Sequence, residues 1–128
     1  MLDTNAIGDA MQERRGVRSR FERHFGSVGV SSIVVFELRY GIAKSSNSTI
    51  NDQRLTDFID LGIAIAPFLA EEAAAAGLLR VQMERVGKPM GLYDLLIAAH
   101  ALRLNATLVT RDAAFTGVDG LKVEDWTV

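Results

Sequence analysis

Short runs of apolar and β-branched residues alternate along this chain with longer stretches whose apolar residues recur every three or four positions. The short runs predict β-strands, and the longer stretches predict amphipathic helices. Their alternation is typical of an α/β fold in which a mostly parallel sheet of about five strands is covered by about six helices. The expected strands cover residues 1–3, 28–30, 63–66, 107–110 and 121–124.

Capping residues and helix-breaking residues set the expected helix boundaries. Thr4 or Asn5 is expected to cap a first helix that starts near Ala6, and Ser31 or Ser32 is expected to cap the third. A second helix is predicted by apolar residues at positions 17, 21 and 25, and the later helices are expected over 33–44, 50–61, 70–86 and 93–105.

Composition limits the classes of protein and of site. With 128 residues and 48% hydrophobic content, the chain can bury a core of its own, so we expect one domain over residues 1–128. It has no cysteine and only two histidines, which makes an oxygen-ligated metal more plausible than a thiolate or histidine site. Neither a leader segment nor a membrane-length apolar run is visible, so a soluble protein of the cytoplasm, without a membrane partner, is expected.

The formal net charge of -2 provides no global attraction to nucleic acid. A local basic segment lies between Glu13 and His24, where five arginines accompany two glutamates and give a net charge of +3. Its arginines are Arg14, Arg15, Arg18, Arg20 and Arg23. The segment is either a surface for RNA or a protein partner or an ordinary solvated helix face, and both interpretations stay open here.

Four acidic residues, Asp3, Glu37, Asp94 and Asp112, are the candidate site. Asp3 ends the first apolar run, Asp112 follows the strand predicted at 107–110, and Asp94 opens an apolar helix. Ligands of open α/β sheets bind beyond the carboxyl ends of the strands, so these three side chains are expected to meet there, with Glu37 joining them. Clustered carboxylates repel one another unless a divalent cation neutralises them, which indicates Mg²⁺, with Mn²⁺ as a substitute.

Each acid also has a purely structural interpretation. An aspartate at or near the start of a helix satisfies free backbone N–H groups, which applies to Asp3, Asp94 and Asp112. Glu37 is harder to explain in this way, because it lies within the apolar stretch 33–38 where a carboxylate without a role is costly.

Several polar residues near these acids are candidates for supporting roles. The hydroxyl of Thr110 is placed to fix a carboxylate rotamer, and Asn5 to contact a metal-bound water or to cap a helix. Arg39 is a weaker candidate for neutralising phosphate charge near Glu37. A histidine within an apolar helix is usually a hydrogen-bonded core residue, so His100 is assigned no catalytic role.

Four segments taken together resemble the PIN-domain ribonucleases of the VapC toxin type. They are Leu2-Asp3-Thr4-Asn5, Phe36-Glu37-Leu38-Arg39-Tyr40-Gly41, Tyr93-Asp94-Leu95-Leu96-Ile97-Ala98-Ala99-His100-Ala101 and Leu108-Val109-Thr110-Arg111-Asp112. Each segment alone is weak, but their order across almost the whole chain is specific to that family.

The resemblance implies a PIN-like three-layer α/β/α sandwich and a magnesium-dependent endoribonuclease that leaves a 5′-phosphate and a 3′-hydroxyl. It also implies a homodimer held inactive by a cognate VapB-type antitoxin, with structured RNA, often tRNA, as substrate. By motif, Asp3 and Asp94 are the expected main metal ligands, Glu37 a ligand directly or through water, and Asp112 the fourth acid. Arg14, Arg18, Arg23 and Arg39 are the expected RNA or antitoxin contacts.

The chain departs from the family pattern at its beginning. Only Met1 and Leu2 precede Asp3, whereas the first strand of the family is longer, so either translation starts upstream or this strand is curtailed. The α-amino group is then expected within about 7 Å of Asp3, the reach of two extended residues. A positive charge so placed competes with a cation, so weaker Mg²⁺ affinity is expected than with a longer N-terminus.

Two other classes of protein remain as alternatives. A phospho-acceptor receiver domain also collects aspartates at strand ends and uses a Lys-Pro pair, which Lys88-Pro89 superficially matches. Here the lysine follows a helix rather than a late strand, which disfavours that class. A catalytically silent antitoxin-binding protein is the second alternative, and the presence of all four acids argues against it.

Overall fold

Five parallel chain segments lie side by side in the computed structural model, which describes residues 1–13 and 16–128. Strand β1 (Gly29–Ser31) pairs with β2 (Ala64–Ala66), and β3 (Leu108–Val109) pairs with β4 (Val123–Glu124). Leu2 joins the two pairs, because it forms parallel bridges to Val30 of β1 and to Val109 of β3. The order across the sheet is therefore β2, β1, the segment of residues 1–3 (the Leu2 segment), β3 and β4.

The predicted first strand over residues 1–3 is wrong as a strand, since only the bridge at Leu2 remains of it. Its backbone is nevertheless paired on both sides. The Leu2 amide donates to the Gly29 carbonyl at 2.9 Å, and the Asp3 amide donates to the Val109 carbonyl at 3.1 Å. The segment is short because a helix begins at Thr4, directly after Asp3.

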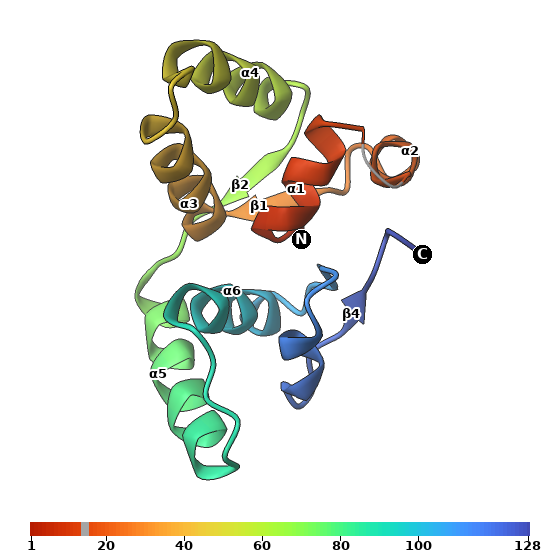
Figure 1. Cartoon of the computed structure of the whole chain (residues 1–128). Coiled ribbons are helices and arrows are strands. Elements are labelled where there is room, and N and C mark those ends of the chain that lie inside the picture. Colours follow the sequence, from red (N-terminus) through yellow and green to blue (C-terminus); the bar gives the residue numbers. More distant parts are fainter. Residues whose placement is uncertain (14–15) are drawn as a thin grey trace.

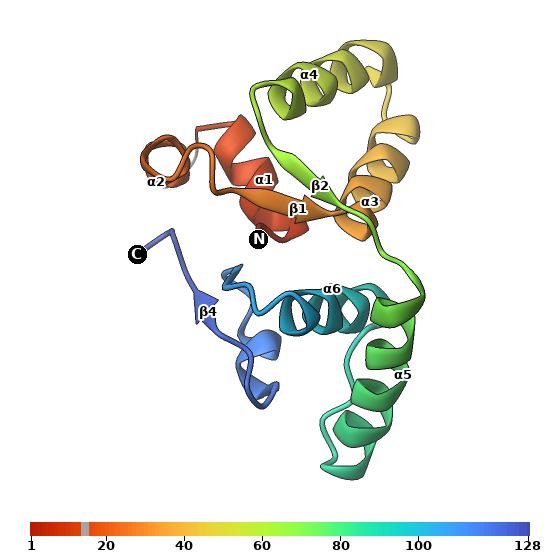
Figure 2. The same cartoon turned by 180° about the vertical axis from the view of Figure 1, so that it is seen from behind.

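Helices cover the strands on two sides, which gives the expected three layers. Figures 1 and 2 show α3 and α4 on one side of β1 and β2, and α5 and α6 on the other. The helices are α1 (Thr4–Met11), α2 (Val17–Arg23), α3 (Ser32–Ala43), α4 (Ser48–Asp60), α5 (Ala70–Arg85), α6 (Leu92–Arg103) and a 3₁₀ turn, η1 (Ala113–Gly117). The predicted α/β architecture is confirmed.

The core fills the space between these layers and fixes their positions. Leu2, Val30 and Leu108 from the sheet are fully buried, as are Val34 of α3 and Leu55 of α4. Burying such side chains contributes roughly 1.5–3 kcal/mol each relative to exposure, so the sheet centre holds the strand ends firmly.

The cap of the first helix differs from the expectation. Asp3, rather than Thr4 or Asn5, is the N-cap of α1, and its Oδ1 accepts a hydrogen bond from the Ala6 amide at 2.8 Å. The third helix is capped by Ser31, whose Oγ accepts from the Ile33 amide at 3.1 Å, as one of the two expected alternatives. None of the helices in the described residues is long and apolar enough to cross a membrane.

Candidate active site

The four predicted acids come from four different elements. Asp3 ends the Leu2 segment, Glu37 lies in the middle of α3, Asp94 is in the first turn of α6, and Asp112 caps η1 just after β3. Because parallel strands end at one edge of a sheet, Asp3 and Asp112 emerge at the same edge.

Electrostatics show that the four carboxylates converge. The pKa of Asp94 is raised above its ordinary value, first by burial and then by the negative charges of Asp112, Glu37 and Asp3. Carboxylates influence one another in this way only when they are near neighbours. The structure therefore brings the four carboxylates within electrostatic range of one another, and their role as a shared site remains a prediction.

Asp3 is the most deeply buried of the four, with 4% of its surface exposed. Burial raises its pKa, and the charge of Asp112 raises it further, whereas hydrogen bonds from the Thr110 hydroxyl and the Ala6 amide, and the charge of Arg111, oppose that rise. The net result is a carboxylate whose charge is unfavourable in the absence of a cation.

Thr110 connects two of the acids. Its hydroxyl donates to the carboxylate of Asp3, and the same oxygen accepts from the Asp112 amide at 3.0 Å. Thr110 is itself buried, so this geometry is well defined. The contact joins the loop after β3 to the residue that starts α1.

Glu37 is anchored to the start of α1. The hydroxyl of Thr4, the residue directly after Asp3, donates to Glu37 Oε1 at 2.8 Å. Glu37 is half-buried, so it does not sit in solvent on an open helix face. One hydrogen bond thus links the helix that contains Glu37 to the helix capped by Asp3.

The side chains fit a hard cation chemically, although they do not enclose one. Among residues 1–13 and 16–128, no group of three or more Asp, Glu, His or Cys side chains is arranged to hold a metal ion as it stands. Asp3 and Asp112 each direct an oxygen at a backbone amide, and Glu37 directs one at Thr4. The donor set is entirely carboxylate, and the repulsion at Asp94 is the kind of strain that a divalent cation relieves.

The profile of the PIN domain matches residues 1–121. This chain belongs to the PIN-domain family. It is 34% identical over 128 residues to the tRNA(fMet)-specific endonuclease VapC of Shigella flexneri, covering 98% of this chain and 96% of the relative. It is 39% identical over 101 residues to Ribonuclease VapC2 of Rickettsia felis, covering 78% and 75% of the two chains.

Solved structures match this PIN domain over nearly its whole length. One is VapBC2 from Rickettsia felis bound to a DNA fragment from its promoter, with a TM-score of 0.90, 35% identity and coverage of 98% and 97%. Another is DNA-bound VapBC from Salmonella typhimurium, with a TM-score of 0.91, 32% identity and coverage of 98% and 96%. The resemblance inferred from four sequence segments is confirmed.

Two of the residues predicted to support the acids, Asn5 and Arg39, form no hydrogen bond or ion pair with them in the described part of the chain. Asn5 is exposed in the first turn of α1. Arg39 pairs with Asp52 Oδ1 at 2.5 Å and donates to Thr56 Oγ1 at 3.2 Å, both in α4, so its side chain is engaged away from Glu37. The expected phosphate contact of Arg39 remains a prediction.

The basic segment of the PIN domain is only partly described, since Arg14 and Arg15 lie outside the described residues. Arg18 pairs with Glu22 at 3.2 Å and lies over the Phe58 ring at 5.3 Å from its centroid. Arg23 is exposed on α2. Arg18 thus packs between α2 and α4, whereas Arg23 faces solvent.

The α-amino group lies at the other end of the Leu2 segment from the Asp3 side chain. It donates to the Thr107 carbonyl at 2.8 Å, and burial lowers its pKa while the charge of Glu124 opposes that shift. Its neighbours are therefore at the amino end of β3. Nothing in this placement supports competition with a cation, and the expected weakening of Mg²⁺ affinity remains untested.

Sequence reasoning missed one ion pair beside the site. Arg111 Nε contacts Asp9 Oδ2 at 3.0 Å, and Asp9 is 3% exposed. The pair joins α1 to the residue immediately before Asp112. The two residues are 102 positions apart, so no local sequence signal indicated that they meet.

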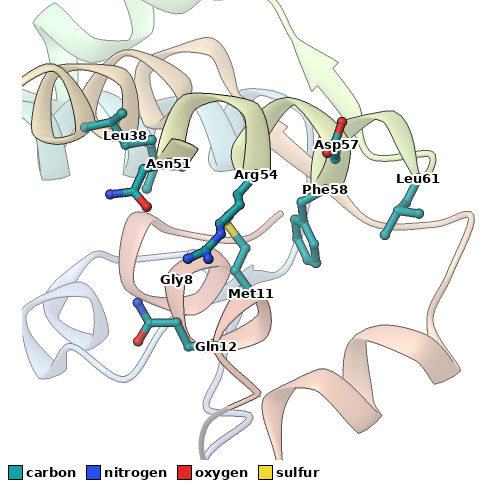
Figure 3. A pocket seen from close by; sticks show the side chains of 10 residues that line it. Gly8, Met11, Gln12, Leu38, Asn51, Arg54, Asp57, Phe58 and Leu61 are labelled. Atoms are coloured by element: carbon teal, nitrogen blue, oxygen red, sulfur yellow. The ribbon is translucent and has the colours of Figure 1, made fainter. Parts of the chain in front are cut away.

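An open groove of about 540 Å³ lies between α1, α3 and α4, and none of the four candidate acids lines it. Figure 3 shows side chains of α4, among them Arg54 and Phe58, directed toward α1. The residues around it are Gly8, Met11, Gln12, Leu38, Ile42, Asn51, Arg54, Asp57, Phe58 and Leu61. The groove is mainly apolar and has a few polar side chains, a composition typical of peptide-binding surfaces.

Proposed function

We propose that this PIN-domain protein is an RNA-cleaving hydrolase, an endoribonuclease toxin that requires Mg²⁺ and is neutralised by a cognate VapB-type antitoxin in the cytoplasm. The observation that carries the proposal is the convergence of Asp3, Glu37 and Asp112 on Asp94, whose pKa is raised first by burial and then by the charges of those three carboxylates. The names of the relatives, ribonucleases and a tRNA-specific endonuclease, support the same activity.

The roles proposed for the acids are those that the family resemblance implies. Asp3 and Asp94 are the main metal ligands, Glu37 acts directly or through a water, and Asp112 orients the attacking water. Thr110 holds Asp3 and the backbone of Asp112 in fixed relation through its single hydroxyl. When bound, Mg²⁺ polarises a phosphoryl oxygen and makes water a stronger acid, and Mn²⁺ supplies the same chemistry.

The deciding experiment is RNA cleavage by the wild type and by Asp94→Asn. Removing one charge from the site with little change of shape is expected to abolish cutting in Mg²⁺ while the circular dichroism spectrum stays the same. Asp60→Asn is the matched control, because Asp60 is an exposed aspartate at the end of α4. Undiminished cutting by Asp94→Asn counts against the assignment of the site.

Mapping the cut ends identifies both the RNA that is cleaved and the chemical groups left at the cut. Total RNA is incubated with the protein in Mg²⁺ or EDTA, and 5′-phosphate ends that appear only with Mg²⁺ are expected. The Shigella flexneri relative is named as specific for tRNA(fMet), so a tRNA is the first purified substrate to try. Cleavage that persists in EDTA contradicts the metal requirement.

The antitoxin is proposed to bind the groove between α1, α3 and α4 through the apolar face of a helix. The solved relatives are complexes named VapBC, which supports a partner chain of this kind. Helical apolar faces bind such grooves through residues three and four positions apart. Arg14, Arg18 and Arg23 are the proposed basic contacts for the partner or for RNA, and the chain itself is proposed to act as a homodimer of a single domain.

Gly8 offers a direct test of this groove. It lies on the wall of the groove, and a Cβ added at Gly8 meets nothing within 4 Å, so Gly8→Leu is expected to fold and to fill the groove. Co-purification with the cognate antitoxin is expected to fail while RNA cleavage persists. Gly41→Leu is the matched control, because Gly41 has equal space on α3 outside the groove. Normal antitoxin capture by Gly8→Leu places the partner elsewhere.

The receiver-domain alternative has no structural support. Lys88 is exposed and lies between α5 and α6, whereas a receiver needs its lysine at the end of a late strand.

A further inference from the structure

A buried hydrogen bond joins two residues outside the acidic site. His100 in α6 is 0% exposed, and its Nδ1 lies 2.7 Å from the Oγ of Ser31, which is also 0% exposed. The two residues are 69 positions apart in the sequence. The contact is therefore a tertiary link made in the centre of the molecule.

Ser31 is a junction between strand and helix. It is the last residue of β1 and the N-cap of α3, and its Oγ also accepts from the Ile33 amide at 3.1 Å. The single oxygen of Ser31 is thus bonded both to the first turn of α3 and to a side chain of α6. Through it, the start of α3 is held at a fixed position relative to α6.

Both helices contain acids of the proposed site. Glu37 lies six residues after Ser31 in α3, and Asp94 lies six residues before His100 in α6. At 1.5 Å per helical residue, each acid is roughly 9 Å along its helix from the link. Rotation or sliding of α6 against α3 at the link therefore changes the distance between the two carboxylates.

The contacts of His100 contribute little net stability to the fold. Its Nε2 is buried and has no hydrogen-bond partner among the described residues, and the Phe68 ring stands perpendicular to the imidazole at 5.5 Å between centroids. Burial lowers the pKa of His100, while Glu72 opposes that shift, so the ring is neutral near pH 7. An unpaired buried polar atom is destabilising, and it offsets the gain from one hydrogen bond.

An apolar side chain of similar size would fill this space without the unpaired nitrogen. What it would lack is the bond to Ser31. We propose that His100 is a positioning residue, whose hydrogen bond to Ser31 fixes the spacing of Asp94 and Glu37 and thereby the affinity of the acidic site for a divalent cation. This inference rests on the proposed metal site.

The test compares two substitutions of His100 by their affinity for Mn²⁺, measured by calorimetry, and by their melting temperature in EDTA. His100→Leu fills the same space with an apolar side chain but removes the hydrogen bond to Ser31. It is expected to bind Mn²⁺ about tenfold more weakly, the lower end of what outer-shell contacts of metal sites contribute. His100→Asn places an amide near the position of Nδ1, and it is expected to recover most of that loss.

A stability control separates positioning from folding. Ile97→Val removes one buried methylene from the same helix without touching the link, so it lowers the melting temperature and is expected to leave Mn²⁺ affinity unchanged. If affinity simply follows melting temperature across the three variants, the role of His100 is structural and the inference fails.

Ser31→Ala provides the second route if His100→Leu does not fold. It is expected to weaken Mn²⁺ binding as His100→Leu does, and the double variant is expected to be no weaker than either single one, because both remove the same link. Wild-type affinity in Ser31→Ala overturns the inference. A wild-type protein that binds no Mn²⁺ and cuts no RNA contradicts the proposed function itself, which is a distinct outcome.

Discussion

Single carboxylates in this protein serve as helix caps and as members of the acidic site at the same time. Oδ1 of Asp3 accepts from the Ala6 amide, and Oδ1 of Asp112 accepts from the Ala114 amide. A carboxylate has two oxygens, so capping with one does not prevent metal binding with the other. The structural and functional interpretations of these aspartates are therefore compatible, and the cap fixes the direction of the side chain.

The raised pKa of Asp94 predicts how stability depends on pH without metal. A carboxyl whose folded pKa is raised stabilises the fold fully below its ordinary pKa of 3.8, and that contribution is lost as pH rises through the folded pKa. In EDTA at pH 7, Asp94→Asn is therefore expected to melt a few degrees above the wild type. The difference should shrink as pH falls toward 4.

Adding Mg²⁺ reverses this comparison. The ion neutralises the repulsion that the wild type retains, so it raises the melting temperature of the wild type much more than that of Asp94→Asn. Thermal unfolding at pH 7 with and without Mg²⁺ measures both effects. A variant that melts below the wild type in EDTA shows that Asp94 stabilises the fold through its charge at the N-terminal end of α6.

Arg111 is expected to matter for stability as well as for the site. Arg111→Met leaves the buried carboxylate of Asp9 without its partner, and because Arg111 itself is exposed, the expected cost is about 1–3 kcal/mol, that of an unsatisfied buried acceptor. Arg80→Met is the control, because Arg80 and Glu84 form an exposed pair at 3.9 Å that contributes less than about 1 kcal/mol. Urea unfolding gives both values, and equal losses refute the special role of the Asp9 pair.

Helices were predictable as elements because their apolar spacing is a local property, and the first strand was not. The spacing in 70–86 matches α5 within one residue, and that in 93–105 matches α6 within two. The Leu2 segment is held by bonds to Gly29 and Val109, which no pattern within residues 1–3 reveals. The cap of α1 was not predictable either, because the sequence pattern places Asp3 at the end of a strand rather than at the start of a helix.

The start of α5 offers a prediction about an element. Glu72 is 6% exposed, and its Oε1 accepts from the Leu69 amide at 2.8 Å, which satisfies a backbone donor at the N-terminus of the helix. Glu72→Ala is expected to lower the free energy of unfolding by about 1 kcal/mol, as the loss of a cap does. The neighbouring Glu71 is exposed and pairs with Arg103, so Glu71→Ala is expected to lose less. A loss for Glu71→Ala equal to that for Glu72→Ala contradicts the capping role.

At the scale of the molecule, the approach of the four acids to one another was predictable because the parallel fold places strand ends and helix starts at one edge. Asp3, Asp94 and Asp112 each have such a position in the sequence, and Glu37 was identified by its apolar neighbours. The contacts that organise them were not predictable, because Thr4 meets Glu37 across 33 positions and His100 meets Ser31 across 69. Such pairs arise from packing of whole layers rather than from local preference.

Binding of RNA by a protein with net charge -2 needs a positive surface, and Arg18 and Arg23, the two described candidates in the basic segment, differ in their packing. Arg23 is exposed, whereas Arg18 pairs with Glu22 and lies over Phe58. If RNA phosphates bind this helix, Arg23→Gln lowers the slope of log affinity against log salt by about 0.7 for a single strand. Arg18→Gln is expected to change the slope less and the stability more, because its guanidinium is already engaged. Filter binding in Ca²⁺ over a salt series measures the slopes, and an unchanged slope for Arg23→Gln identifies α2 as a solvated face.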